Sequence, residues 1–128
     1  MKEAVEEDPI EYLWSMKYNF DFEPFVVGII VSGEDVERSK WENRVAKVWP
    51  GVTVVAGGSV DGVDLLIVDT LYRPLFPPPS CGAKYMISNS VLDLGVMTQS
   101  WTCLKMTGMY TCYIFNKYLE ARHHWHLL

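Results

Sequence analysis

The hydrophobic positions in the first half of the chain predict alternating strands and a helix. Residues 25–31 form a nearly unbroken apolar run rich in β-branched side chains, which predicts a strand buried on both faces. Residues 52–56 and 63–68 predict two further strands. Over residues 34–48 apolar side chains recur at helical spacing, with the charged residues largely on the other side. A Pro-Gly pair ends this predicted helix.

The second half of the chain is predicted to be mostly helical. Residues 71–79 contain a run of prolines and predict a long ordered loop, because proline fits neither a regular helix nor a central strand. A helix is expected over residues 81–92, followed by a minimal strand at residues 96–97. Another helix is expected over residues 98–106, capped by the hydroxyl of its first residue. The aromatic-rich tail, residues 110–128, is expected to be a partly helical C-terminal extension.

The N-terminal residues 1–24 are expected to be an extension of the domain. Apolar side chains over residues 10–18 fit a short helix that Asp8 caps. This segment is too apolar to stand in solvent, so we expect it to pack on the domain, which would span residues 25–109.

The order of these elements predicts an α/β domain with a small four-stranded, mostly parallel sheet flanked by three helices. One connection departs from the usual pattern, because residues 57–62 form only a turn between the second and third strands. A turn of this length is too short for a helical crossover, and the general rule would favour an antiparallel pair there.

Composition and charge narrow the function classes. The chain has 128 residues, of which 49% are hydrophobic and 21% are charged, as in an ordinary globular domain. The net charge of −5 disfavours a broad nucleic-acid surface but is compatible with a local basic pocket. There is no apolar run near the roughly 18 residues that span a membrane, and the acidic N-terminus does not resemble a secretory signal, so no membrane partner is expected. The three cysteines have no metal-type spacing, which favours reduced, mostly buried thiols and an intracellular protein.

Four features of the chain share their order with a known family. They are the first strand ending in Ser32-Gly33, the short link before the third strand, the apolar strand itself, and the run Val96-Met97-Thr98-Gln99-Ser100-Trp101. In this order they resemble a BRCT domain over about residues 25–109. In that family the last run holds a hydrophobic pair, a capping Ser or Thr, and a nearly signature tryptophan, so Trp101 is expected in the core on the last helix. The resemblance also implies that the second and third strands lie parallel to the first, on either side of it.

The resemblance implies binding of phosphoserine or phosphothreonine peptides. The family's phosphate pocket uses a Ser or Thr and a Gly at the end of the first strand and a Lys early in the second helix, and Ser32, Gly33 and Lys84 stand at the matching places. The residue types suit the chemistry, since a hydroxyl, a glycine N–H and a lysine can all donate to phosphate oxygens. Thr70 and Arg73, just after the third strand, are candidates for the border of this pocket.

The expected protein is therefore an interaction module rather than an enzyme, and it needs no cofactor. Members of the family mostly serve nuclear DNA repair, checkpoint and chromosome-segregation assemblies, which implies a nuclear protein with a phosphorylated partner. Two alternatives remain open. The aromatic terminal segments could pair with another BRCT or folded domain independently of phosphate, or the pocket could bind phosphorylated DNA ends, which the acidic charge disfavours.

Three further features favour other chemistry only weakly. Asp69 ends the third strand, in a way similar to the phosphoacceptor of a receiver domain, but the first strand lacks the acidic pair that a receiver needs. His123, His124 and His126 have no partner at metal-ligand spacing, so no metal site is expected. Cys81 lacks the context of a catalytic triad. The chain contains no nucleophile–base pair and no nucleotide-binding loop of known type.

Overall fold

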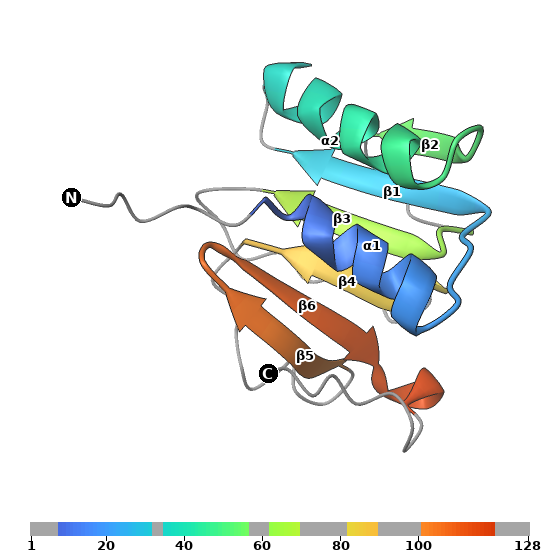
Figure 1. Cartoon of the computed structure of the whole chain (residues 1–128), viewed down its shortest axis with the longest axis vertical. Coiled ribbons are helices and arrows are strands. Elements are labelled where there is room, and N and C mark those ends of the chain that lie inside the picture. Colours follow the sequence, from blue (N-terminus) through green and yellow to red (C-terminus); the bar gives the residue numbers. More distant parts are fainter. Residues whose placement is uncertain (1–7, 32–34, 57–61, 70–81, 90–100, 120–128) are drawn as a thin grey trace.

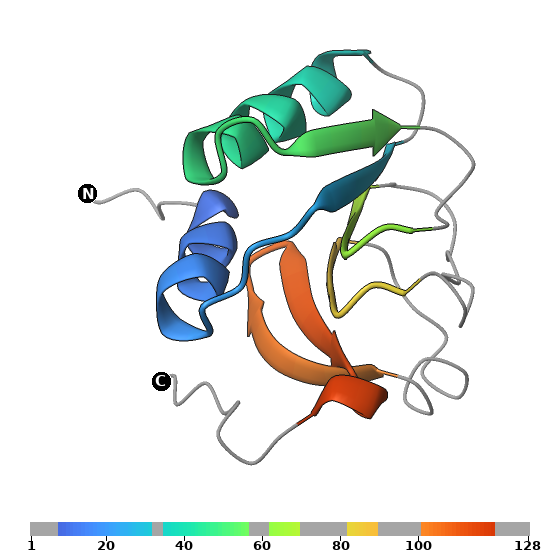
Figure 2. The same cartoon turned by 90° about the vertical axis from the view of Figure 1, so that its right-hand side faces the viewer.

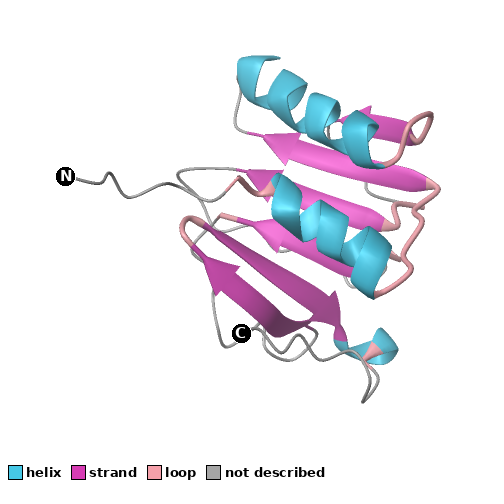
Figure 3. Ribbon diagram, in the orientation of Figure 1, coloured by secondary structure: helices cyan, strands magenta, loops and turns pink. Residues whose placement is uncertain are grey.

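The computed structural model describes residues 8–31, 35–56, 62–69, 82–89 and 101–119, and these form one sheet with helices on one of its faces (Figures 1 and 3). In chain order the described elements are α1 (Ile10–Asn19), β1 (Val26–Val31), α2 (Asp35–Val48), β2 (Thr53–Ala56), β3 (Leu65–Asp69), β4 (Tyr85–Ser88), β5 (Trp101–Thr107), β6 (Tyr110–Phe115) and the 3-10 turn η1 (Asn116–Tyr118).

The sheet is mixed, with the strand order β2-β1-β3-β4-β6-β5. Strands β2, β1, β3 and β4 are parallel, whereas β6 runs antiparallel to both β4 and β5. The chain moves from β1 to β2 on one side and then crosses to β3 on the other side, so the strand order reverses between β1 and β3. The parallel strands all end at the same edge of the sheet, which we call the carboxyl edge (Figure 1).

Both helices cover the same face of the sheet (Figure 2). Their buried side chains and the inward residues of the strands form one hydrophobic core, whose helical members are Tyr12, Leu13 and Met16 from α1 and Trp41, Val45 and Val48 from α2. The Nζ of Lys17 donates a 2.8 Å hydrogen bond to the carbonyl of Val48 and so caps the C-terminus of α2 from α1. Helix α1 therefore packs against both the sheet and the neighbouring helix.

The opposite face of the sheet is also buried, although neither α1 nor α2 packs there. Its core is a second cluster consisting of Val63, Leu66, Val68, Ala83, Met86 and Trp101. Gly28 lies on this side, and a Cβ added to it would come within 2.9 Å of Cγ2 of Val63. The close approach of β1 to Val63 therefore requires glycine at this position.

Two polar features fix the segment between α1 and β1. Asp21 adopts φ 55° directly after the helix, and the N–H of Phe22 donates to the carbonyl of Met16 at 2.9 Å. The helix therefore ends with aspartate at a left-handed position that glycine usually occupies. At the start of β1, the Oδ2 of Asp64 accepts hydrogen bonds from the N–H groups of Phe25 and Val26, each at 2.8 Å, which holds β1 in register with β3.

The first three strands lie close to their predicted positions, and β1 has β2 and β3 as parallel neighbours on either side. The predicted four-stranded parallel sheet with three flanking helices is nevertheless wrong. The described residues form a six-stranded mixed sheet with two α-helices.

The errors in the fold prediction lie in the second half of the chain. The predicted helix over residues 81–92 is wrong, because Tyr85–Ser88 is strand β4, buried at the centre of the sheet. The predicted helix over residues 98–106 is wrong in the same way, because Trp101–Thr107 is strand β5. Trp101 is buried, but it packs from a strand against the ring of Phe115, with centroids 5.1 Å apart. The predicted strand at residues 96–97 lies outside the described residues.

The hairpin of β5 and β6 has a local cause. Thr107 pairs with Tyr110, so the connection contains only two residues, and Gly108 takes φ 58° there. Two-residue hairpin turns favour glycine at such positions because they need positive φ. The residues on either side are rich in aromatic and β-branched types, which suit a pleated, half-buried surface better than a helix. Strand β6 lies within the range expected as a C-terminal extension, and it forms the contact between β4 and β5.

Candidate functional site

The carboxyl edge of the sheet carries a row of polar side chains on the face that the helices cover. Val68, Ser88 and Thr111 are register neighbours on β3, β4 and β6. The residues one step nearer the edge are Asp69, Asn89 and Tyr110, and we call these three the polar row. Because side chains alternate along a strand, Asp69 shares its face with Leu65 and Ile67, and Tyr110 shares its face with Cys112.

Asp69 is the centre of the polar row. Its side chain is buried, with 7% of the residue exposed. Oδ1 accepts a 2.6 Å hydrogen bond from Nδ2 of Asn89. Oδ2 accepts hydrogen bonds from Nε1 of Trp41 at 2.7 Å and from the hydroxyl of Tyr110 at 2.9 Å. A buried carboxylate is costly unless donors surround it, and here neutral groups from a helix, a loop residue after β4 and a reversed strand provide them.

Trp41 and Arg44 link the polar row to both helices. The guanidinium of Arg44 lies 4.6 Å from the ring centroid of Trp41, and its Nε is 3.1 Å from Oδ1 of Asp8. The same Oδ1 accepts the N–H of Ile10, so Asp8 caps α1 while it binds the arginine on α2. The Trp41 indole is thus held by Arg44 on its face and by Asp69 at its N–H group.

Tyr110 is held at both its hydroxyl and its backbone. Its hydroxyl donates to Asp69, and its carbonyl accepts a 2.9 Å hydrogen bond from the hydroxyl of Tyr12 on α1. Burial raises the pKa of the Tyr110 phenol well above its ordinary value, and the charge and hydrogen bond of Asp69 raise it further. Tyr110 is therefore a firm proton donor to Asp69 at neutral pH.

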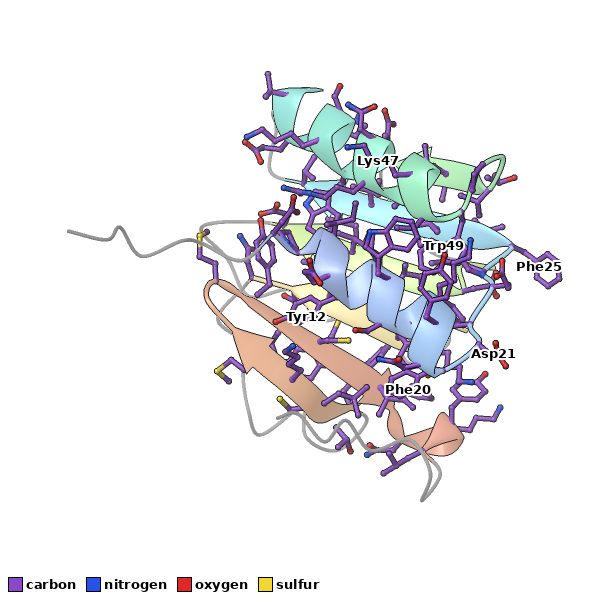
Figure 4. The ribbon with its side chains drawn as sticks, viewed as in Figure 1. Tyr12, Phe20, Asp21, Phe25, Lys47 and Trp49 are labelled. Carbon is purple, nitrogen blue, oxygen red and sulfur yellow. The ribbon has the colours of Figure 1, made fainter. Side chains whose placement is uncertain are left out.

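Lys84 lies at the other edge of the sheet from the end of β1. Its N–H donates to the carbonyl of Asp64 at 2.9 Å, one residue before β4 begins. Val31, the last residue of β1, pairs instead with Asp69. The five-residue step from Asp64 to Asp69 spans roughly 16 Å of strand. Figure 4 shows Phe25, the residue before β1, at this amino edge.

The other residues of the predicted phosphate pocket, Ser32, Gly33, Thr70 and Arg73, lie outside the described residues. The predicted phosphate clamp therefore stays a prediction, and the one member that the structure places gives it no support. The Nζ of Lys84 lies 5.5 Å from the ring centroid of the adjacent Tyr85.

The candidates that the structure describes offer no activated thiol and no metal-binding cluster. Within the described part of the chain there is no cluster of three or more potential metal ligands. Burial raises the pKa of the Cys103 thiol, and it raises the pKa of the fully buried Cys112 thiol well above its ordinary value, so neither is an activated nucleophile. Cys81 and the histidines at positions 123, 124 and 126 lie outside the described residues.

The sequence pointed to one member of the polar row and missed the others. Asp69 stands at the polar end of an apolar strand, where the sequence suggested a receiver-like phosphoacceptor. The first strand lacks the acidic pair of a receiver, which excluded that interpretation. Asn89 was expected within a helix and Tyr110 in a C-terminal tail, so no pattern placed them beside it. Gly108 was the available signal for a hairpin, and a hairpin there places Tyr110 on a strand that runs antiparallel to the preceding one.

Comparisons with protein-family models, curated proteins and solved structures find no match for this chain. Among the described residues, neither helix combines the length and apolar character needed to cross a membrane. The candidate site therefore rests on the geometry of the carboxyl edge.

Proposed function

We propose that this domain binds a small organic ligand of nucleotide type at the carboxyl edge of its sheet, over the polar row. The observation that carries the proposal is the buried carboxylate of Asp69 at the reversal of the strand order, held by three donors from separate parts of the chain.

The position of the site supports the proposal. In open α/β sheets, ligands bind outside the carboxyl ends of the strands, where the strand order reverses, and dinucleotides and flavins occupy this place in two common fold types. Here the reversal falls between β1 and β3, and Val31 and Asp69 are the paired last residues of those strands. This part of the case is an analogy between sheets, and it identifies a place rather than a reaction.

The chemistry of the polar row supports it as well. A buried carboxylate adds little stability compared with an apolar residue of the same size, so its presence at a sheet edge calls for a role beyond packing. Asp69 fixes the side chains of Asn89 and Tyr110, which are only partly buried. A phenol held in this way is suited to hydrogen bonding with a ligand that lies across the edge.

Binding of phosphorylated partners, the function that the BRCT resemblance implies, stays a prediction. So do its nuclear role, the pairing with another folded domain, and the binding of DNA ends. The described residues favour the carboxyl edge instead, because Lys84 lies at the amino edge.

Two tryptophans allow a direct test, because Trp41 lies within α2 and Trp49 directly follows it. The indole N–H of Trp41 donates to Asp69 in the polar row. The indole N–H of Trp49, after the C-terminus of α2, donates to the carbonyl of Phe22 at 3.1 Å. ATP, NAD, FMN and S-adenosylmethionine would each be titrated into ¹⁵N-labelled protein, with the indole signals assigned from Trp41→Phe and Trp49→Phe variants. A saturable shift of the Trp41 signal, with the Trp49 signal unchanged, supports the proposal. No shift of the Trp41 signal with any of the four compounds would overturn it.

A further inference from the structure

Two oxidisable side chains share one oxygen atom of the buried Asp69 carboxylate. Oδ2 accepts the indole N–H of Trp41 at 2.7 Å and the phenol O–H of Tyr110 at 2.9 Å. The two rings meet edge to face, with their centroids 5.6 Å apart and an angle of 80° between their planes. An indole, a phenol and a proton acceptor are therefore in direct contact with one another.

The acidity of the oxidised rings decides which of the two keeps a radical. A phenol that has lost an electron is a far stronger acid than an indole that has lost one, so Tyr110 gives up its proton to the shared carboxylate first. Arg44 acts in the same direction, because its guanidinium lies 4.6 Å from the ring centroid of Trp41 and opposes a positive charge there. Asp8 offsets part of this effect through its contact with Arg44. An electron lost from either ring is therefore expected to leave the radical on Tyr110.

Tyr110 holds its proton before any oxidation. Burial raises the pKa of its phenol, and the negative charge of Asp69 raises this pKa further. Two charged groups of α2 also act on it, Arg44 in the opposite direction and Glu37 in the same direction as Asp69. The electron thus leaves a neutral phenol, whose proton has an acceptor within the distance at which a side chain acts as a general base.

Oxidation of Tyr110 would also remove a buried charge. Before oxidation the site holds the carboxylate of Asp69, a residue with 7% exposure. After the proton has moved, the site holds a carboxylic acid and a neutral phenoxyl radical. A buried carboxylate is costly even when donors surround it, so this loss of charge favours the oxidised state relative to the same pair of groups in water.

We propose that Tyr110 is a redox-active residue, which gives an electron to a one-electron oxidant at the carboxyl edge while its proton passes to Asp69. The O–H bond of the phenol breaks, an O–H bond forms at Oδ2 of Asp69, and the electron reduces the oxidant. A high-potential metal complex or a photoexcited flavin has the required chemistry. Tyr110 is partly exposed, so the electron can leave without the oxidant entering the core. This proposal goes beyond ligand binding and does not depend on it.

Tyr18 provides a matched control. Its ring also contacts an indole, that of Trp14, with centroids 5.6 Å apart, but Tyr18 is 69% exposed. Within the part of the chain that the structure describes, its hydroxyl has no hydrogen bond to a carboxylate. Tyr18→Phe and Tyr110→Phe thus remove the same hydroxyl from two tyrosine–tryptophan pairs, of which one includes a built-in proton acceptor.

Photogenerated tris(bipyridine)ruthenium(III) would oxidise the full chain and its variants, with the phenoxyl radical followed by transient absorption and electron paramagnetic resonance. Tyr110→Phe should remove most of the rapidly formed phenoxyl signal, and Tyr18→Phe should leave that signal unchanged. Asp69→Asn should slow its formation at least about tenfold, because it removes the proton acceptor.

A second measurement uses the unsubstituted chain, since Asp69→Asn also affects stability. Proton transfer within an existing hydrogen bond does not depend on buffer, whereas an exposed tyrosine gives its proton to buffer base. The signal that Tyr110→Phe removes should therefore form at the same rate at every phosphate concentration. A rate that rises in proportion to phosphate, or an equal rapid signal in Tyr110→Phe and the unsubstituted chain, overturns the proposal. Neither outcome bears on ligand binding, which the Trp41 signal tests separately.

Discussion

Replacing Asp69 with asparagine tests whether its carboxylate organises the carboxyl edge. The substitution keeps the size of the side chain and removes its charge. Hydrogen bonds to a charged group contribute about 1.5–3 kcal/mol each, against about 0.5–1.5 kcal/mol for neutral pairs. Asp69 accepts three such bonds, from Trp41, Asn89 and Tyr110. Asp69→Asn should therefore lower the free energy of unfolding by about 3–4.5 kcal/mol.

Asp69→Ala should cost more, because it leaves three donors without their acceptor in a buried site. At about 1–3 kcal/mol for each donor, we expect a loss of roughly 4–6 kcal/mol. Urea unfolding measures both variants through the midpoint at constant m value. Glu23→Gln is the control, since it removes the charge of an exposed carboxylate and should change the stability by less than about 0.5 kcal/mol.

The indole proton of Trp41 gives an independent check on the same substitution. In the unsubstituted chain it points to a carboxylate oxygen at 2.7 Å, so its NMR signal should lie downfield and should move upfield in Asp69→Asn. If Asp69→Asn unfolds at the same urea concentration as Glu23→Gln and the Trp41 signal does not move, the carboxylate does not hold the edge together and the polar row loses its central role.

Three further substitutions follow from the geometry. Gly28→Ala should lower the free energy of unfolding by about 1–2 kcal/mol, because its Cβ would lie 2.9 Å from Cγ2 of Val63. Adding Val63→Ala should recover part of this loss in a double-mutant cycle. Purely additive losses would contradict the contact. Asp21→Gly should raise the urea midpoint, by about 0.5–1 kcal/mol in stability, since φ 55° is strained for aspartate, and a lower midpoint would show that the side chain has a stabilising role there. Tyr110 holds its proton more tightly in the folded than in the unfolded chain, whose tyrosine pKa is about 10, so unfolding releases protons and the stability should fall as the pH rises above about 10. Tyr110→Phe should flatten that part of the pH profile of stability, and an equally steep profile would exclude Tyr110 as its cause.

The first half of the fold could be predicted because each element has a local sequence signal. Strand β1 is an apolar run bounded by Pro24, and α2 combines helical spacing of apolar residues with a Pro-Gly stop. Even the parallel pairing across the short link between β2 and β3 followed from the order of these elements through the resemblance. Local periodicity and the proline and glycine positions were sufficient for the elements themselves, whereas their parallel pairing was expected only from the resemblance.

The second half could not be predicted in the same way because its strands are short or ambiguous. The four residues of β4 form an apolar segment too short to distinguish a buried strand from a helix turn by periodicity. Strand β5 contains a register irregularity between Cys103 and Lys105, which breaks the two-residue alternation that marks a strand. With both segments assigned to helices, the β5–β6 hairpin had no partner and its turn signal at Gly108 carried little weight.

The direction of β6 explains why the candidate site could not be predicted from the sequence. Because β6 is antiparallel to β4, its first residue, Tyr110, lies at the edge where the parallel strands end. A parallel strand in the same place would bring its last residue, Phe115, to that edge, and Phe115 has no hydroxyl to donate to Asp69. One of the three donors to the buried Asp69 therefore depends on the reversed direction of a strand two places away, and no local sequence pattern predicts that strand's position in the sheet.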